Sequence, residues 1–363
     1  MHKLSYASPL TRLLVTCGIT AISVLGAAQT SYVLTDLGAS VSGQTLAMDI
    51  SPSGIVVGIS GAFGAQIPCT WTPSGSGMTF RSLGKPTGAV YSWGFGVNDS
   101  GQIAGTGGKV FTWENGFLWS GSSWADLSSK QSAQSEALAV SASGSVVGCT
   151  ASAAIWEGGK VHALPGTTVA YGMNDLGQVV GYYNDHAGYM APFIWTPSAP
   201  NGTTGTTTYI SGIPGGRAMG INLAGDVVGD TSAGGIGVAF YLANGSSNAV
   251  PLTFGGNSSA RKINNNGQAV GNAVVKVNGL NATHGFVWDS VNGMQDLNGL
   301  NIVGGIPAGW VFVCGGVGTL NATNIPTVSI NDAGRICGTA QVTIGGVKTN
   351  HAFLLTPQSA AGP

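Results

Sequence analysis

Few side chains in this sequence could take part in acid–base chemistry or recognise a charged ligand. Only 7% of the 363 residues are charged, and the chain contains 5 histidines. The sequence has no G-x-S-x-G elbow, H-E-x-x-H helix, P-loop or EF-hand loop, which are common local signatures of nucleophiles, zinc, phosphate and calcium sites. Candidate functional residues are therefore those that depart from the internal repeat of the sequence.

Eight residues depart from the repeat in a way that suits ligand binding. They are Trp93, Glu136, Tyr182, Tyr183, His186, Arg217, Arg261 and Trp310. Several stand where the chain is expected to enter an innermost strand, three belong to one short loop (182–186), and Trp310 lies in a 29-residue insertion (298–326). Arg261, followed by Lys262, replaces the apolar or small residues of other copies. Burying such charges is costly, so we expect them at a channel mouth.

Aromatic faces combined with Arg, carboxylate and imidazole groups suit a carbohydrate or another polar ligand. We therefore interpret the chain as a binding or interaction module, with extracellular glycans as the expected ligands. Two alternatives stay open. In the first, the eight residues are scattered surface positions without a common ligand. In the second, the protein is a polysaccharide-active lyase or hydrolase, with His186 or Tyr183 as general base. Arg217 and Arg261 would then neutralise a substrate carboxylate, as β-elimination of a uronic acid requires.

No metal or cofactor is expected. The cysteines of the mature chain stand far apart with no C-x-x-C pair, and no oxygen-rich calcium loop occurs. In an exported protein one disulfide could form, between Cys314 and Cys337, because both belong to the last repeat. The alternative is four buried thiols, at Cys69, Cys149, Cys314 and Cys337.

The repeat that positions these residues is a short motif that occurs seven times. It consists of an apolar residue, usually Asn, two variable residues, Gly, three further residues and a second Gly. The copies are ISPSGIVVG (50–58), VNDSGQIAG (97–105), VSASGSVVG (140–148), MNDLGQVVG (173–181), INLAGDVVG (221–229), INNNGQAVG (263–271) and INDAGRICG (330–338). The motif predicts two strands joined by a tight turn, in which the first Gly is left-handed and Asn or Asp forms local backbone hydrogen bonds.

A third strand is expected after each motif, and in most copies a fourth strand follows around a Leu. The third strands are PCTW (68–71), VFTW (110–113), AAIW (153–156), PFIW (192–195), AFYL (239–242), GFVW (285–288) and AFLL (352–355). The recurring Trp is expected to pack between neighbouring units. Four antiparallel strands in about 45 residues make a propeller blade, so the sequence predicts an all-β, seven-bladed β-propeller.

The ends of the chain predict how the ring closes. Tyr32–Gly38 matches a fourth strand without a blade, whereas the last repeat ends after its third strand at Leu355. The N-terminal strand should therefore complete the C-terminal blade, although six or eight blades are possible if the 298–326 insertion contains strands. The loops that enter the innermost strands share one end of the ring, the loop end, and the Asn-x-x-Gly turns form the other, the turn end. We expect the site at the loop end.

The third-strand segments Asn350–Leu355 and Thr283–Trp288, with Ile330–Gly334 and the Asp-Leu-Gly opening, resemble the HAF family of bacterial extracellular repeat proteins. The resemblance covers essentially the whole mature chain and implies export and a repeat β fold, but no activity. The chain departs from the His-Ala-Phe pattern in most copies, where the His position is Ile67, Lys109, Ser152, Ala191 or Val238. His284 and His351 are therefore interpreted as hydrogen-bonding residues at strand ends.

The N-terminus predicts export. Lys3 and Arg12 precede an apolar stretch (13–28), so residues 1–28 are interpreted as a signal peptide and 29–363 as a single domain. We expect a secreted, extracellular or periplasmic monomer that does not contact the membrane once the signal is removed. With 13 basic and 14 acidic residues and no basic run, nucleic acid is not an expected partner. The expected partners are an extracellular polysaccharide or a cell-surface protein.

Overall fold

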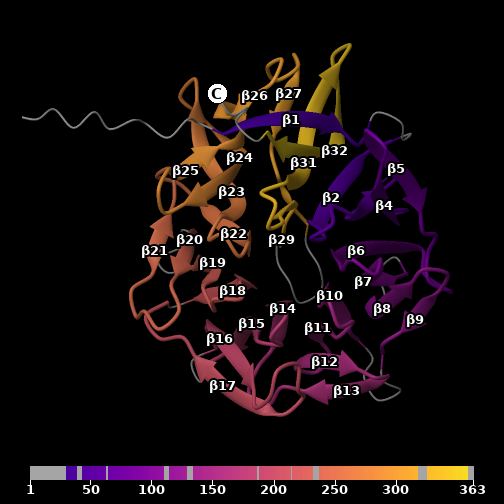
Figure 1. The fold of residues 1–363 in the computed structure, drawn as a ribbon, viewed down its shortest axis with the longest axis vertical. Coiled ribbons are helices and arrows are strands. Elements are labelled where there is room, and N and C mark those ends of the chain that lie inside the picture. Colours follow the sequence, from indigo (N-terminus) through magenta and orange to yellow (C-terminus); the bar gives the residue numbers. More distant parts are fainter. Residues whose placement is uncertain are drawn as a thin grey trace, which may run out of the picture.

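The chain folds into seven β-sheet blades arranged in a ring (Figure 1), and a separate two-stranded sheet lies beside them. This computed structural model describes residues 30–38, 43–62, 64–109, 114–128, 134–185, 188–213, 215–231, 237–317 and 325–358. The described residues contain no α-helix, and a 3₁₀ turn, η2 (Leu297–Gly299), interrupts the strands. The predicted all-β, seven-bladed propeller is confirmed.

Each blade contributes four strands, which run from the channel to the rim in chain order in blades 1 to 6. The innermost strands are β2 (Thr45–Ile50), β6 (Tyr91–Val97), β10 (Glu136–Val140), β14 (Val169–Met173), β18 (Gly216–Ile221), β22 (Ser258–Ile263) and β30 (Val328–Ile330). The second strands are β3 (Val56–Ser60), β7 (Gln102–Gly108), β11 (Val146–Cys149), β15 (Val179–Asn184), β19 (Val227–Thr231), β23 (Ala269–Val277) and β31 (Ile336–Ile344).

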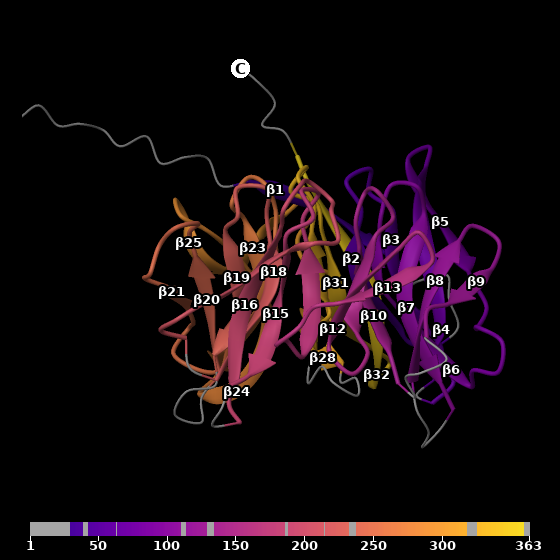
Figure 2. The same ribbon diagram turned by 90° about the horizontal axis from the view of Figure 1, so that it is seen from below.

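The outer half of each blade is built in the same way, and Figure 2 shows the blades from the side. The third strands are β4 (Ile67–Ser74), β8 (Glu114–Ser120), β12 (Ala153–Glu157), β16 (Met190–Pro197), β20 (Val238–Leu242), β24 (Leu280–Asp289) and β32 (Val347–Pro357). The outermost strands are β5 (Gly77–Ser82), β9 (Trp124–Asp126), β13 (Lys160–Ala163), β17 (Gly205–Tyr209), β21 (Val250–Leu252), β25 (Gly293–Asp296) and β1 (Ser31–Asp36).

The N-terminal strand closes the ring as the sequence predicts. β1 pairs antiparallel with β32, with Leu34 opposite Leu355. The 298–326 insertion contains short strands that join this same blade or pair with each other: β26 (Asn301–Ile302), β27 (Trp310–Phe312), β28 (Gly316–Val317) and β29 (Ile325–Pro326). Because these strands form no further four-stranded sheet, the described residues make seven blades.

The third strand of blade 2 differs from the prediction. β8 (Glu114–Ser120) pairs with β7, so GFLW (116–119) takes the place assigned to VFTW (110–113), which lies outside the described residues. Trp119 stands opposite Ile103, as Trp71 stands opposite Val56 in blade 1. The two segments have similar sequences, so the sequence alone does not show which of them forms the third strand, and the pairing with β7 does.

The recurring Trp side chains are buried between blades. Trp71, Trp156 and Trp195 are each at most 5% exposed, and Trp288 is 8% exposed. The Trp71 indole nitrogen donates a hydrogen bond to the Leu37 carbonyl at 2.8 Å, and that of Trp156 donates to Leu127 at 2.8 Å. Each bond reaches the end of the outermost strand of the preceding blade. The predicted packing role is confirmed for these residues, whereas Trp113 lies outside the described residues.

The two motif glycines are needed for different reasons. The first has a positive φ in all seven copies, for example +82° at Gly177. The second lies beside a bulge in the innermost strand, where a Cβ on Gly181 would collide with the Val169 carbonyl oxygen. Six innermost strands carry this one-residue bulge, at Met48, Phe95, Leu138, Tyr171, Met219 and Arg261. β30 pairs without a bulge.

Two turn glycines allow a matched test of this account. Gly177 and Gly267 both have positive φ, but an added Cβ would lie 2.9 Å from the Asn201 Cα at Gly177 and would meet nothing within 4 Å at Gly267. Gly267→Ala should lower the free energy of unfolding by about 1 kcal/mol through backbone strain alone. Gly177→Ala should cost about 1 kcal/mol more. Denaturant unfolding of both variants measures the difference, and equal losses would contradict the account.

Removing the closing strand should destabilise the whole ring. A chain that begins at residue 39 lacks β1 and the buried Tyr32 and Leu37, which contribute about 1.5–3 kcal/mol each by burial, and it exposes the edge of β32. Its melting temperature should fall clearly below that of a chain that begins at residue 30. If calorimetry gave the two chains the same melting temperature, the closure would be wrong.

Candidate functional site

A layer of apolar side chains divides the central channel. The bulges turn Met48, Phe95, Leu138, Tyr171 and Met219 inward, each at most 2% exposed, and they form one cluster with Ile325 from the insertion. We call the five bulge side chains the partition. Because bulges re-aim a side chain and leave it outside the ladder, the same irregularity in five blades fills the channel.

At the loop end, aromatic residues pack onto the partition. Trp93 is half-buried, with its ring 5.9 Å from Phe95 and 5.5 Å from Tyr91. Tyr182 stacks on Tyr171 with ring centroids 6.0 Å apart. The loop end therefore has an aromatic floor.

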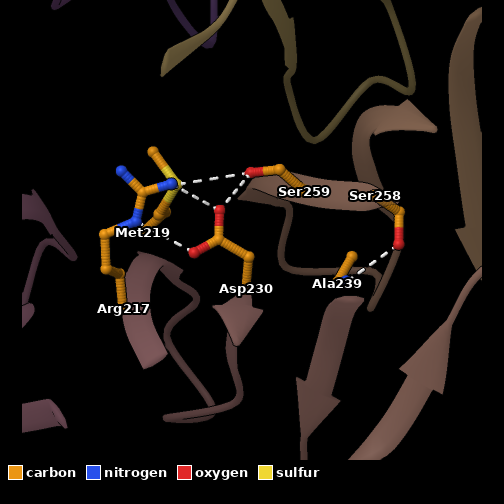
Figure 3. Close-up of polar contacts among 6 residues, drawn as sticks. All are labelled: Arg217, Met219, Asp230, Ala239, Ser258 and Ser259. Carbon is orange, nitrogen blue, oxygen red and sulfur yellow. Dashed lines mark hydrogen bonds and ion pairs between the residues drawn. The ribbon is translucent and has the colours of Figure 1, made fainter. Parts of the chain in front are cut away.

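Arg217 is held beside this floor by a buried ion pair (Figure 3). Its Nε and Nη2 donate to the two carboxylate oxygens of Asp230 at 2.9 and 2.6 Å, and the Ser259 hydroxyl donates to the same carboxylate at 2.6 Å. The guanidinium carbon lies 5.8 Å from the centroid of the Tyr171 ring. Burial lowers the pKa of Arg217, but the bonds to Asp230 outweigh it, so the pKa rises and Arg217 stays charged.

Asp230 is a site residue that the sequence reasoning missed. It follows the second motif glycine, Gly229, and pairs directly with Arg217 in the ladder. Other copies have Ile59, Thr106, Cys149, Tyr182, Asn272 or Thr339 at this position. Asp230 is the only acidic residue among the seven copies at this position, and it occurs in the same copy as the unusual Arg217. That coincidence could have identified the pair from the sequence.

Glu136 lies on the same side of the partition. It is fully buried. Burial is the main cause that raises the pKa of Tyr182, and Glu136 acts on the same hydroxyl as one of the smaller electrostatic causes. Four of the eight candidates, Trp93, Glu136, Tyr182 and Arg217, are thus gathered at the loop end around one cluster.

The other candidates are not all part of this group. Tyr183 packs against Tyr209, with ring centroids 4.1 Å apart, and contacts the core cluster of blades 3 and 4. Trp310 packs edge-on against His351 in blade 7, at 5.8 Å. His186 lies outside the described residues.

Arg261 stands at the sixth bulge position, level with the partition, and together with Lys262 it lines cavities on the turn-end side of that layer. This corrects the expectation that they reach a mouth at the loop end, because the bulge in β22 turns Arg261 into the channel interior. Lys262 Nζ lies 2.7 Å from Asp49, which also accepts a hydrogen bond from the Ser329 hydroxyl at 2.6 Å.

A continuous ring of hydrogen bonds surrounds the turn end. The motif Asn side chain donates to a backbone carbonyl of the next blade, for example Asn174 Nδ2 to Asn222 O at 2.8 Å. Where Ser51 and Ser141 replace Asn, Asp99 and Asp175 of the next blade accept a backbone N–H instead. All seven junctions are bridged in one of these two ways.

This ring corrects the interpretation of the motif Asp residues as local turn formers. Asp99 accepts from Ser53, 46 residues away, and Asp332 accepts from Asn265, 67 residues away. The turn is completed by the motif Asn, whose side-chain oxygen accepts from the backbone four residues on. The Asp residues therefore connect blades, which no local pattern in the sequence reveals.

The two His-Ala-Phe-type histidines each bind the acid of the Asp-Leu segment in their own blade. His284 Nδ1 lies 2.7 Å from Asp296, and His351 Nδ1 lies 3.1 Å from Asp36. The expected hydrogen-bonding role is confirmed, but the expected position at a strand end is wrong, because β24 and β32 both begin several residues before the histidine. Burial raises the pKa of Asp296, but the bonds from His284 and the Asn298 N–H outweigh it and hold the pKa below its usual value.

The four described cysteines are buried thiols, and none of them forms a disulfide. No cluster of three or more His, Cys, Asp or Glu residues that could hold a metal ion occurs within the described part of the chain. In that same part no helix has the length and apolar character that a bilayer span needs.

No family model matches the chain, and no curated protein does. The resemblance to the HAF family therefore rests on its sequence motifs. Among solved structures the chain is similar to an oligogalacturonate lyase from Vibrio parahaemolyticus, at 10% identity and a TM-score of 0.50, over 90% of this chain and 97% of that one. It is also similar to TolB from Acinetobacter baumannii, at 12% identity and a TM-score of 0.43, over 91% and 97%. A third similar structure is the lectin of Aleuria aurantia, at 12% identity and a TM-score of 0.40, over 76% of this chain and 100% of that one. The likeness to the lyase shows the fold alone.

The Asp296–His284 pair predicts a pH-dependent contribution to stability. Because the folded pKa of Asp296 is lowered, its contribution is complete above the ordinary Asp value of about 4 and is lost as the pH falls through the folded value. Asp296→Asn should lower the melting temperature at neutral pH, and the difference from the parent protein should shrink in acid.

Asp126→Asn is the matched control for this measurement. Asp126 stands opposite Phe117 as Asp296 stands opposite Phe286, but the residue at the histidine position of blade 2 is Asn115. A melting difference for Asp296→Asn that stayed constant from neutral to acid pH, or one equal to that of Asp126→Asn, would contradict the role assigned to the pair.

Proposed function

We propose that this chain is an exported binding module whose loop end recognises a glycan. The observation that carries the proposal is the gathering of Trp93, Tyr182 and Arg217 at one end of the channel. Aromatic faces provide area for the apolar face of a sugar ring, and neighbouring polar groups orient its hydroxyls. Trp93 is the half-buried member and would meet the ligand first.

The arrangement of charges favours binding over catalysis. β-Elimination needs a general base within hydrogen-bond reach of the substrate proton and a cation free to neutralise the substrate carboxylate. Arg217 already donates two hydrogen bonds to Asp230, and Arg261 lines a cavity on the turn-end side of the partition. Tyr183 packs against Tyr209 instead of facing either arginine. The enzyme remains the alternative to be tested.

Export and partners belong to the same proposal. Residues 1–28 act as a signal peptide, and the mature chain 29–363 works as a single secreted, extracellular or periplasmic domain. The HAF resemblance and the apolar stretch 13–28 that follows Lys3 and Arg12 support this assignment. The partner is a polysaccharide or a cell-surface protein that displays one, and the protein acts as a monomer.

Glycan-array binding of the mature protein tests the proposal. The parent should be retained by a subset of the printed oligosaccharides, and Trp93→Ala should weaken the affinity for those glycans about tenfold, which is about 1.4 kcal/mol. Tyr209→Ala is the control, because Tyr209 is 47% exposed on β17 of blade 4, the outermost strand.

The alternative is decided with the same glycans. Incubation with polyuronates, followed by ultraviolet absorbance of unsaturated products, reports a lyase, and reducing-end release reports a hydrolase. Product formation without retention on the array would overturn the binding proposal. Equal affinities of the parent and Trp93→Ala would remove the loop end as its site.

A further inference from the structure

Arg261 is a buried cation without a partner. Its side chain is directed into the channel from the bulge in β22 and is 6% exposed. It makes no hydrogen bond or ion pair within the described residues, and its Nε is fully buried. Buried Arg side chains are normally paired, as Arg217 is with Asp230. The Nε of Arg261 is therefore a buried donor without an acceptor inside the propeller.

The nearby carboxylate of Asp49 does not bond to Arg261. Asp49 acts electrostatically on Arg261, but its oxygens already accept from Lys262 Nζ, the Ser329 hydroxyl and the Val97 N–H. Lys262 neutralises Asp49, so the charge of Arg261 is left without a counterion. Burial is the main cause that lowers the pKa of Arg261. The lowered pKa reflects the free-energy cost of burying a charged guanidinium without a counterion.

Arg261 lines a cavity that adjoins the turn-end opening. The inner cavity is about 50 Å³ and is bounded by Tyr171 and Phe95 of the partition. It shares Lys262 and Met173 with an outer cavity of about 140 Å³ among the motif Asn and Asp residues. One water molecule needs about 10–15 Å³ by this measure, so the inner cavity has room for a group of three heavy atoms.

We propose that the turn end of the channel binds one carboxylate group, with Arg261 as its anchor. The planar guanidinium presents a fork of donors that matches a carboxylate, and a charged acceptor there would supply the missing counterion. The site is separate from the loop-end site, because the partition lies between them.

The rim of the outer cavity restricts the ligand further. Asp99, Asp175 and Asp332 line it. Three carboxylates around the entrance repel a polyanion, so the ligand carries its single carboxylate at its tip and is otherwise neutral or cationic. A small free monocarboxylate and the C-terminus of a peptide both meet this description.

Melting and titration experiments on the mature protein test the proposal. Sodium acetate, at constant ionic strength against sodium chloride, should raise the melting temperature of the parent. Arg261→Met places at this position the residue that blades 1 and 5 carry, Met48 and Met219. This variant should melt higher than the unliganded parent, because an unpaired charge is removed, and acetate should no longer shift it. Arg335→Met, which changes an arginine bonded to exposed Ser53 at the turn end, should respond to acetate like the parent.

Calorimetric titration distinguishes the two sources of the carboxylate. If acetyl-Gly-Gly with a free carboxylate binds at least tenfold more tightly than acetate, and its amide does not bind, the ligand is a peptide C-terminus. Comparable binding of both acids indicates a small monocarboxylate. If Arg261→Met does not fold, Arg261→Lys, which retains the charge but not the fork, should weaken binding at least tenfold. Equal stabilisation by chloride, or no binding of either acid by the parent, would overturn the proposal.

Discussion

The close contact between the second motif glycine and the bulged innermost strand is the constraint on which the channel depends. The inner-strand carbonyl lies where a Cβ would be, at Gly58, Gly148 and Gly229 for example, so only glycine allows the two strands to pair with the extra residue in place. That residue is then directed into the channel. Five blades use it for an apolar side chain and blade 6 uses it for Arg261, so one backbone irregularity produces both the partition and the buried cation.

The turn end and the closing strand hold the blades at the spacing that this channel requires. Asn side chains bridge five junctions, and Asp side chains bridge the two where Asn is replaced by Ser. Because each bond links a blade to the next, the ring is complete only when the seventh blade exists, and that blade needs β1. Chain closure at the rim and hydrogen-bond closure at the turns therefore support each other. Because the chain has few charged residues, hydrogen bonds from neutral amide side chains link most of the neighbouring blades.

Features that recur in every copy could be predicted from the sequence, and features that depend on register could not. The seven repeated glycine motifs predicted the blade count. The lone strand at the N-terminus and the missing fourth strand of the last repeat predicted the closure. VFTW and GFLW read alike, and pairing with β7 decided between them. Arg217 was recognisable as unusual, but its neutralisation by Asp230 required knowing that the two residues stand opposite. The position of the Arg261 side chain along the channel depends on the bulge in β22, which cannot be recognised from residue 261 alone. The sequence analysis therefore predicted the wrong end of the channel for Arg261.

A crystal structure of the mature protein grown in sodium acetate, with crystals of Arg261→Met as the reference, tests most directly whether the channel holds an unpaired cation that awaits a carboxylate. The account predicts a carboxylate within hydrogen-bond distance of the Arg261 guanidinium in the parent crystals and none in the variant. An Arg261 side chain that is hydrogen-bonded to protein groups, with no acetate in the cavity, would contradict it.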